Sequence, residues 1–511
     1  MKLNQRWLAI LMLLTLLCTS ITTLAQDSVK LVPYTSAAFG YESVIPEGWT
    51  EAGPGTFVRQ SNAADRTVLV QQAAPLAPDK LLTAMLPQLA LTTAPESVGT
   101  HQGKALEWTL YKVDVSVGAI NVAVDLALAA GDGKTYVVLL QTAPEDFDTL
   151  HQSIFLPVLD ALTPLKPAEE AVPYDVEEVT FQNGDVTLAG TLTLPPTAGK
   201  HPAVVLVSGS GPQDRDESLG GGIAIKPFHL LADALTRAGV AVLRYDDRGA
   251  GKSTGDFASA TTRDFAADAA AAISYLLTHS EISADQIGLL GHSEGGLIAA
   301  LLGAEDKNLA FVIALGGPAV IGRDVLIQQN KRIMAAAGMS QDMIDSQADY
   351  VEQLIATVDD PAAMEELIYQ RTLEQLKALP AEKQAELGNL EDYARLVAQQ
   401  GVKQNATAWF KEFVSYDPSK DWAKTTIPVL AIYGAKDVQV DAQQNAPALE
   451  AALKQAGNTD YQIVTLPDAN HLFQTADTGA PTEYGKLPAE FTPELLPTIL
   501  EWLQKHVTIA K

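Results

Sequence analysis

The sequence predicts an α/β protein in which a mostly parallel sheet carries helices on both faces, preceded by a small α+β domain. From about residue 200 onward, continuous apolar runs rich in β-branched residues alternate with helical segments, a pattern typical of buried parallel strands. Between about residues 322 and 420 the strand pattern stops and helical periodicity replaces it. We interpret that segment as a helical cap inserted before the last strands.

Residues 1–25 have the pattern of a secretory signal peptide. Lys2 and Arg6 precede an apolar run, and the stretch ends at Ala25 in small residues suited to cleavage. We therefore expect a secreted or periplasmic protein that is cleaved after about Ala25. The apolar run is shorter than the roughly 18 residues of a membrane span, and a retained anchor helix is the alternative.

The charge of the chain excludes several classes of partner. Its 62 acidic and 35 basic residues give a formal net charge of −27, which repels nucleic acid and anionic membrane surfaces. After the signal, no apolar stretch is long enough for stable membrane insertion. Cys18, the single cysteine, would leave with the signal, so the mature chain would contain no disulfide and no cysteine metal site. We expect no cofactor and no metal, and the sequence leaves the oligomeric state open.

One stretch is similar to a nucleotide-binding loop but lacks an essential residue. The segment "RYDDRGAGKSTG", Arg244 to Gly255, contains "GAGKST", but the first glycine of G-x-x-x-x-G-K-[ST] is replaced by Asp246. A carboxylate there would repel phosphate, and the next helix begins only at a capping box formed by Thr261 and Asp264. We therefore predict a structural turn.

The first domain is predicted at residues 26–165 and carries no catalytic constellation, which favours a spacer or binding role. Its opening "FGYESVIPEGW" and its last amphipathic helix resemble the PsbP-like fold. The segment "LKPAEEAVPYD" is rich in proline and acid and predicts a linker at 166–175, so that the second domain covers 176–511. That domain opens with a hairpin at Asn183-Gly184. The buried strands that follow are predicted in "PAVVLVSGSG", "GVAVLRYDD", "QIGLLGHS", "LAFVIALGG", "IPVLAIYGA" and "YQIVTLP".

The candidate nucleophile is Ser293, in the sequence "IGLLGHSEGGLIAALLGA". Gly291 to Gly295 match G-x-S-x-G between a predicted strand and a predicted helix, where the glycines allow a sharp turn that exposes the serine hydroxyl. A serine hydroxyl is a weak nucleophile unless a base removes its proton, so a histidine and an orienting acid must follow.

Two later strand ends supply the acid and the base. Asp437 follows the strand "IPVLAIYGA", and His471 follows the strand "YQIVTLP". Asp441 is the alternative acid, although it suits the cap of the next helix. Asp468 is interpreted as part of a turn, and His506 as a surface residue of the last helix.

An oxyanion hole requires two backbone N–H groups, and loss of one such donor lowers the rate on the order of a hundredfold or more. We predict Glu294 N, directly after the nucleophile, as one donor. The second should come from the loop "VLVSGSGPQDRDE", where we select Ser210, with Gly211 next. Ser208-Gly209 stands there in place of the usual His-Gly.

These motifs, in order across 176–511, resemble bacterial α/β-hydrolase esterases close to the dienelactone hydrolase and prolyl oligopeptidase branch. The resemblance implies an α/β-hydrolase fold with Ser293 as nucleophile, Asp437 as acid and His471 as base, acting on a small-molecule ester. It also assigns "DDRGAGKSTG" to the family's structural turn D-x-R-G-x-G-x-S, with Arg248 bound to nearby carboxylates. Ser208 departs from the histidine that is frequent at this position in the family.

Two alternatives remain from the sequence. A prolyl oligopeptidase-type peptidase or aminoacyl amidase would share the catalytic domain, but its β-propeller needs about 280 residues, roughly twice the length of the first domain. A non-catalytic binding protein on the same scaffold would be expected to lack a member of the triad. The acyl and alcohol groups of the substrate are not determined by the sequence.

Overall fold

The computed structural model describes residues 29–37, 39–61, 65–86, 88–89, 91, 93–117, 120–165, 171–220, 223–381, 384, 387 and 389–509. The predicted signal peptide and the first half of the predicted linker, 166–170, lie outside these residues. The chain divides into two compact units. The first comprises Met1–Glu170, Gly220–Ala224 and Tyr369–Gln400, and the second comprises Ala171–Leu219, Ile225–Ile368 and Gly401–Lys511.

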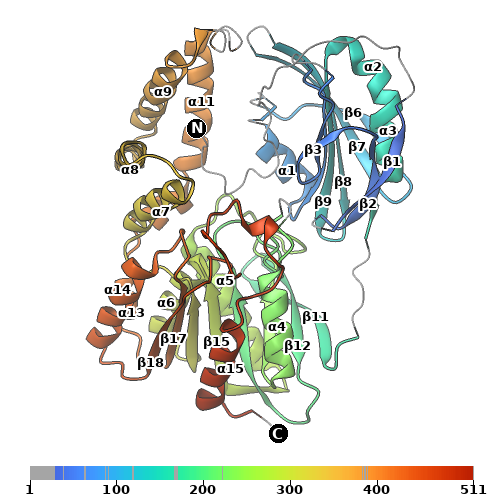
Figure 1. The fold of residues 1–511 in the computed structure, drawn as a ribbon. Helices are drawn as coiled ribbons and strands as arrows, with labels where there is room; N and C mark the ends of the chain where they lie inside the picture. The colour runs from blue at the N-terminus through green and yellow to red at the C-terminus, as the bar shows by residue number, and fades with distance from the viewer. Residues whose placement is uncertain are drawn as a thin grey trace. The chain divides into compact units, whose positions relative to one another are not determined.

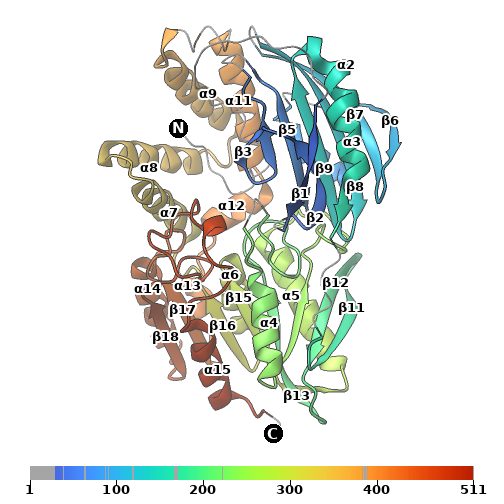
Figure 2. The same cartoon turned by 45° about the vertical axis from the view of Figure 1, so that its right-hand side comes forward.

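The first unit is built on antiparallel sheets. A seven-stranded sheet has the order β3-β4-β5-β9-β8-β7-β6, and a smaller one has the order β1-β2-β10. Helices α2 and α3 (Figure 2) belong to one core with Trp108, and α1, labelled in Figure 1, belongs to a second core on the other face of the larger sheet. This is the small α+β domain that the sequence predicts. Its elements are β1 (Leu31–Ser36), β2 (Tyr41–Pro46), β3 (Thr50–Gly53), β4 (Thr56–Val58), β5 (Val68–Ala74), α1 (Pro78–Met85), β6 (Ser97–Gln102), β7 (Glu107–Val117), β8 (Ile120–Gly131), β9 (Lys134–Thr142), α2 (Phe147–Leu150), α3 (Leu156–Ala161) and β10 (Thr163–Pro164).

The second unit contains an eight-stranded sheet in the order β11-β12-β14-β13-β15-β16-β17-β18. The first two strands form the expected hairpin, in which Asn183 pairs with Val186 and Gly184 has a positive φ of 57°. Every pair from β14 and β13 onward is parallel. The strands are β11 (Asp175–Asn183), β12 (Val186–Leu194), β13 (His201–Val207), β14 (Ala241–Tyr245), β15 (Ile282–His292), β16 (Phe311–Leu315), β17 (Val429–Gly434) and β18 (Tyr461–Leu466). Strand β11 therefore begins at Asp175, inside the predicted linker, because Asp175 already pairs with Leu194 in the hairpin.

Helices cover both faces of this sheet (Figure 1). Because alternate strand residues point to opposite faces, Val205 and Val207 join the core of α5, α6 and α14, whereas Val204 and Leu206 join the core of α4 and α15. Burial on both faces explains why these strands are continuously apolar. The helices are α4 (Pro227–Arg237), α5 (Thr262–Thr278), α6 (Glu294–Glu305), α14 (Ala442–Gln455) and α15 (Leu495–His506).

Every described element between β16 and β17 is helical. Of these helices, α7 lies beside the loop that follows β17, because Gln328 Nε2 donates to Asp441 Oδ2 over 2.8 Å and Gln329 Nε2 donates to the Gln439 carbonyl over 3.3 Å. The stretch Tyr369–Gln400 groups with the first unit, whereas the sequence assigned all of 176–511 to one domain. The helices are α7 (Gly322–Ala336), α8 (Gln341–Ala356), α9 (Pro361–Lys377), α11 (Leu390–Asn405), α12 (Ala408–Ser415) and α13 (Ser419–Trp422).

Within the described part of the chain, none of the helices combines the length and the apolar character needed to cross a bilayer. The same residues contain no group of three or more His, Cys, Asp or Glu side chains that could hold a metal ion.

Candidate active site

Ser293 occupies a strained turn between β15 and α6. Its φ of 54° and ψ of −114° are unusual for a residue with a side chain, and such strain is found mainly where function requires it. The turn needs its glycines, because a Cβ at Gly291 would collide with the backbone of Gly295, and one at Gly295 would collide with the Val207 carbonyl. The backbone N–H of Ser293 donates to the Leu315 carbonyl over 2.9 Å, which ties the turn to the end of β16.

Asp437 and His471 form a buried pair at the ends of β17 and β18. His471 Nδ1 lies 2.7 Å from Asp437 Oδ2, and the two residues are 4% and 0% exposed. Asp437 Oδ1 accepts the backbone N–H groups of Gln439 and Val440 over 2.7 and 2.9 Å. The Asp437 carboxylate therefore orients the histidine through Oδ2 and is anchored by backbone donors through Oδ1.

The alternative acids lie elsewhere. Asp441 is the N-cap of α14, where its Oδ1 accepts the Gln443 N–H over 3.1 Å. The side chain of Asp468 is exposed in the turn before His471. His506 is half-buried and stacks on Trp502 with ring centroids 3.9 Å apart, so it is not the free surface residue that the sequence suggested.

Gly316 places the nucleophile turn next to the acid and base. A Cβ at Gly316 would lie 3.4 Å from Asp437 Oδ2 and 3.5 Å from His471 Nδ1. The preceding residue, Leu315, is the one whose carbonyl binds Ser293 N. Leu315 and Gly316 thus lie next to all three residues of the predicted triad, although these are up to 178 positions apart in the chain (471 − 293).

The predicted oxyanion loop lies directly beside Ser293. A Cβ at Gly209 would be only 3.1 Å from the Ser293 Cβ. The Gly209 N–H donates to Glu217 Oε1 over 3.0 Å, so it is already occupied. Within the described residues, the backbone N–H groups of Ser210 and Glu294 donate to no protein acceptor. Glu294 N opens a helix, where the first N–H groups have no intrahelical partner.

The Glu294 side chain is buried among hydrogen-bond donors. Its Oε1 accepts Thr262 Oγ1 over 2.6 Å and the indole N–H of Trp409 over 2.8 Å, whereas its Oε2 is buried without a hydrogen-bond partner among the described residues. Burial nevertheless outweighs these donors and raises the pKa of Glu294 above its ordinary value. The residue after the nucleophile therefore joins the start of helix α5 to helix α12.

The loop "DDRGAGKSTG" encloses a carboxylate of its own in place of a phosphate. Asp246 Oδ2 accepts the backbone N–H of Lys252 over 2.9 Å, and a Cβ at Gly251 would collide with the Asp246 side chain. Arg248 binds both oxygens of Asp268 over 2.6 and 2.7 Å, the carboxylate pairing that the family resemblance implied.

Ser208, which replaces the family's histidine, donates to both carboxyl oxygens of Asp247 over 2.9 and 3.0 Å. Burial raises the pKa of Asp247 well above its ordinary value. The start of the oxyanion loop is therefore anchored to the strand end of β14 through this serine.

Sequence reasoning did not identify two buried residues at this site, His292 and Glu217. His292 Nδ1 lies 2.6 Å from Glu217 Oε1, and His292 Nε2 lies 2.8 Å from the His471 carbonyl oxygen. Two sequence features could have indicated this pair: a histidine directly before the nucleophile, and an acidic residue in the loop "DRDE". Neither residue falls at a position that G-x-S-x-G specifies.

Family models match the segments of the chain in which the candidate residues lie. The serine aminopeptidase S33 family model matches residues 220–390, which include Ser293. The prolyl oligopeptidase family model matches residues 385–495, which include Asp437 and His471. Esterase EstD of Thermotoga maritima is 26% identical over 342 residues, 66% of this chain and 71% of that protein. The chain is a serine hydrolase of the α/β-hydrolase fold. It resembles esterases near the prolyl oligopeptidase and dienelactone hydrolase branch, as the sequence predicted, while the PsbP-like assignment of the first domain stays a prediction.

Solved structures resemble this serine hydrolase only distantly. Esterase Pf2001 of Pyrococcus furiosus has a TM-score of 0.38 and 15% identity, covering 67% of this chain and 97% of that chain. The α/β-hydrolase GrgF from Penicillium has a TM-score of 0.39 and 16% identity, covering 66% and 99%. At these scores the likeness carries no functional argument.

Proposed function

We propose that this chain is a secreted serine esterase that cleaves small carboxylic esters through an acyl-enzyme intermediate on Ser293. The observation that carries the proposal is the buried 2.7 Å contact between His471 and Asp437, at the strand end whose Leu315 carbonyl binds the Ser293 backbone. An acid that holds Nδ1 of the imidazole leaves the other ring nitrogen available as the base. Secretion is proposed from the N-terminal sequence pattern.

Each residue then has a defined step. Neutral His471 takes the hydroxyl proton of Ser293, and Oγ attacks the ester carbonyl carbon. The negative charge that develops on the carbonyl oxygen is stabilised by the N–H groups of Ser210 and Glu294. Collapse breaks the bond to the alcohol oxygen, which takes the proton from His471 and leaves. Water then repeats the sequence on the acyl-enzyme, returning Ser293 and releasing the carboxylic acid.

Two observations support an ester as the substrate. The curated relative is an esterase, and it is matched over 66% of this chain. The strongly acidic chain also favours neutral small molecules over anionic polymers. The helical cap, with α7 beside the loop of Asp437, is proposed to limit the size of the acyl or alcohol group.

The experiment is a panel of p-nitrophenyl esters of graded acyl length, assayed with the wild-type protein and with Ser293→Ala. We expect turnover that depends on acyl length and disappears in the variant. Wild-type protein that hydrolyses no ester of the panel would contradict the ester assignment. Equal turnover by wild type and variant would contradict the role of Ser293.

A peptidase or aminoacyl amidase is the second candidate, because both matching family models are named for peptidases. The described strands of the first unit favour the esterase, since they form one seven-stranded and one three-stranded sheet and not a ring of four-stranded blades. Aminoacyl and prolyl p-nitroanilides, assayed beside the esters, distinguish the two. A kcat/KM for an amide above that of every ester would favour the peptidase.

A further inference from the structure

The serine hydrolase contains a second buried histidine–carboxylate pair beside the predicted triad. His292 precedes the nucleophile on β15, and Glu217 lies in the loop after β13. They are 5% and 1% exposed, with His292 Nδ1 2.6 Å from Glu217 Oε1. The rings of His292 and His471 have centroids 4.8 Å apart. The mechanism above uses neither His292 nor Glu217.

The hydrogen bonds of this pair reach both halves of the catalytic machinery. Glu217 Oε1 also accepts the Gly209 N–H over 3.0 Å, one residue before the proposed oxyanion donor Ser210. On the other side, His292 Nε2 donates to the backbone carbonyl of His471 over 2.8 Å. A single chain of contacts thus runs from the oxyanion loop, through the residue before the nucleophile, to the backbone of the base.

The partners of His292 define its protonation. Nε2 faces a carbonyl oxygen, which only accepts, and Nδ1 faces a carboxylate, so both ring nitrogens are placed as donors. The charged and titratable groups around the ring are Glu217, His471 and Asp437. Burial opposes the imidazolium, but the Glu217 carboxylate, the His471 carbonyl and Asp437 together more than offset it, and the pKa of His292 is raised above its ordinary value.

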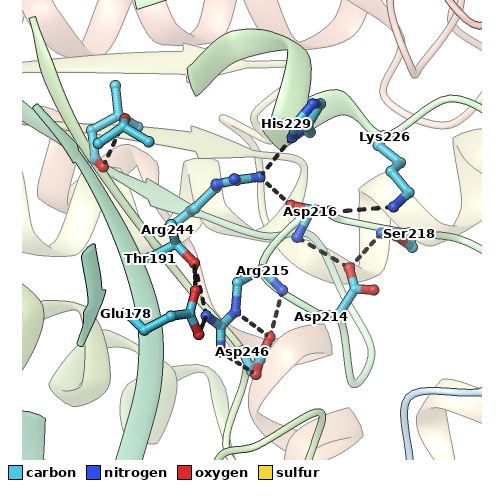
Figure 3. Close-up of polar contacts among 12 residues, drawn as sticks. Glu178, Thr191, Asp214, Arg215, Asp216, Ser218, Lys226, His229, Arg244 and Asp246 are labelled. Carbon is cyan, nitrogen blue, oxygen red and sulfur yellow. Dashed lines mark hydrogen bonds and ion pairs between the residues drawn. The ribbon is translucent and has the colours of Figure 1, made fainter. Parts of the chain in front are cut away.

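Reciprocal ion pairs hold the Glu217 loop in place (Figure 3). Arg215 binds Asp246 through Nε at 3.1 Å and Nη2 at 2.9 Å, and the next residue, Asp216, pairs with Arg244. Asp214 Oδ1 accepts the backbone N–H groups of Asp216 and Ser218 over 3.1 and 2.9 Å.

The residue after these two anchored side chains has a positive φ. Glu217 has φ 57°, a left-handed conformation that is unfavourable for a residue with a side chain. Arg215 and Asp216 are thus bound to β14 and the loop that follows it, while Glu217 turns toward His292. Local strain that the surrounding contacts over-determine is characteristic of functional sites.

We propose that Glu217 and His292 form a positioning pair that holds the oxyanion loop and the His471 backbone in register with Ser293. The proposal deepens the proposed function and rests on it. Glu217 holds the Gly209 N–H, one peptide before the Ser210 N–H, and His292 holds the backbone carbonyl of the base. A shift of about 1 Å in either group would lower the rate about a hundredfold without changing how the ground-state substrate binds.

The test uses three variants of the full chain. Glu217→Gln keeps the shape and one acceptor but removes the charge. His292→Gln retains a donor near the Nε2 position and loses the contact with Glu217. The third is the double variant. We expect each single variant to lower kcat about 10- to 100-fold with KM changed less than about twofold, and the double variant to lose little more than one single variant.

The matched control is Glu177→Gln, which breaks a second Glu–His pair in the same unit. Glu177 Oε2 lies 3.3 Å from His279 Nε2 at the half-exposed surface, away from the site residues. Its kcat should equal that of the wild type. Thermal unfolding of every variant checks folding, and if Glu217→Gln does not fold, Glu217→Asp, which retracts the carboxylate by one methylene, replaces it with the same expected loss.

A second readout separates this proposal from the ester assignment. A fluorophosphonate forms an Oγ–P bond with Ser293 as the P–F bond breaks, fluoride leaves and His471 takes the proton. The labelling rate should fall with Glu217→Gln by the same factor as kcat. If the wild type is labelled but cleaves no ester, the substrate proposal fails while the labelling rates still test the positioning pair. The positioning pair would be overturned by an unchanged labelling rate in a folded Glu217→Gln. It would also be overturned if the fold-loss of kcat in the double variant equalled the product of the two single losses.

Discussion

The indole N–H of Trp409 donates to Glu294 Oε1 over 2.8 Å, which connects helix α12 to the residue that follows Ser293. Trp409 comes from the helical insertion, and Glu294 supplies a proposed oxyanion donor through its backbone. The cap and the nucleophile turn therefore share a part-buried hydrogen bond, and we expect a substitution in the cap to alter the geometry of the turn.

Trp409→Phe removes this donor and retains much of the ring packing. Leaving a buried acceptor with fewer partners should lower the free energy of unfolding by about 1–3 kcal/mol, and the displaced α12 should alter the preference among ester chain lengths. Denaturant unfolding and the ester panel measure the two effects. Tyr416→Phe is the control, because it removes the 2.8 Å hydrogen bond to Asp421 at the end of α12 without touching Glu294. If both variants change the chain-length profile equally, Trp409 has no special link to the site.

Ser293→Ala should reduce kcat by about a millionfold while leaving the thermal unfolding temperature almost unchanged. The turn is imposed by Gly291, Gly295 and the helix start, so the fold does not need the hydroxyl. Ser274→Ala, an exposed serine on α5, serves as the matched control. Residual turnover in Ser293→Ala above that of the buffer would show that another nucleophile is used.

Asp437→Asn should lower kcat about 10⁴-fold with KM nearly unchanged, because the amide cannot stabilise the imidazolium and favours the wrong tautomer of His471. Asp441→Asn is the matched comparison, since asparagine is as good an N-cap as aspartate. It should retain most of the activity and stability. Steady-state kinetics of both variants identifies the catalytic acid. A large loss of kcat in Asp441→Asn, with nearly normal kcat in Asp437→Asn, would reverse the assignment.

Glu294→Gln should change how stability depends on pH. The folded-state pKa of Glu294 is raised by burial above its ordinary value of about 4.5. Between those two pKa values the unfolded chain has lost the proton that the folded protein keeps, so the contribution of Glu294 is present at low pH and is lost as pH rises. The stability of Glu294→Gln relative to wild type should therefore grow from pH 4.5 upward. Unfolding free energies measured from acid to neutral pH test this, and parallel curves would contradict it.

The local patterns of the second domain identified much of the fold. Continuous β-branched runs such as "VIAL" and "VLAIYG" indicated strands buried on both faces, because a strand with a wet face would alternate. Asn183-Gly184 located the hairpin, and Asp246 in place of a glycine excluded a phosphate loop. The domain limits were less accurate, since β11 begins at Asp175 and residues 369–400 group with the first unit.

By itself, the sequence determined the kind of chemistry and the segments that carry it, because G-x-S-x-G and the residues that end each strand are local features of the chain. Only the tertiary structure decided that Asp437, and not Asp441, is hydrogen-bonded to His471. It also decided that the Gly209 N–H already donates to Glu217, while the Ser210 N–H has no protein acceptor among the described residues. The tertiary structure alone revealed the contact between Glu217 and His292, two residues that are 75 positions apart in the chain. Such pairings depend on how a parallel sheet brings distant strand ends to one edge and on which side chains are buried there together, and neither is encoded in the spacing of any single motif.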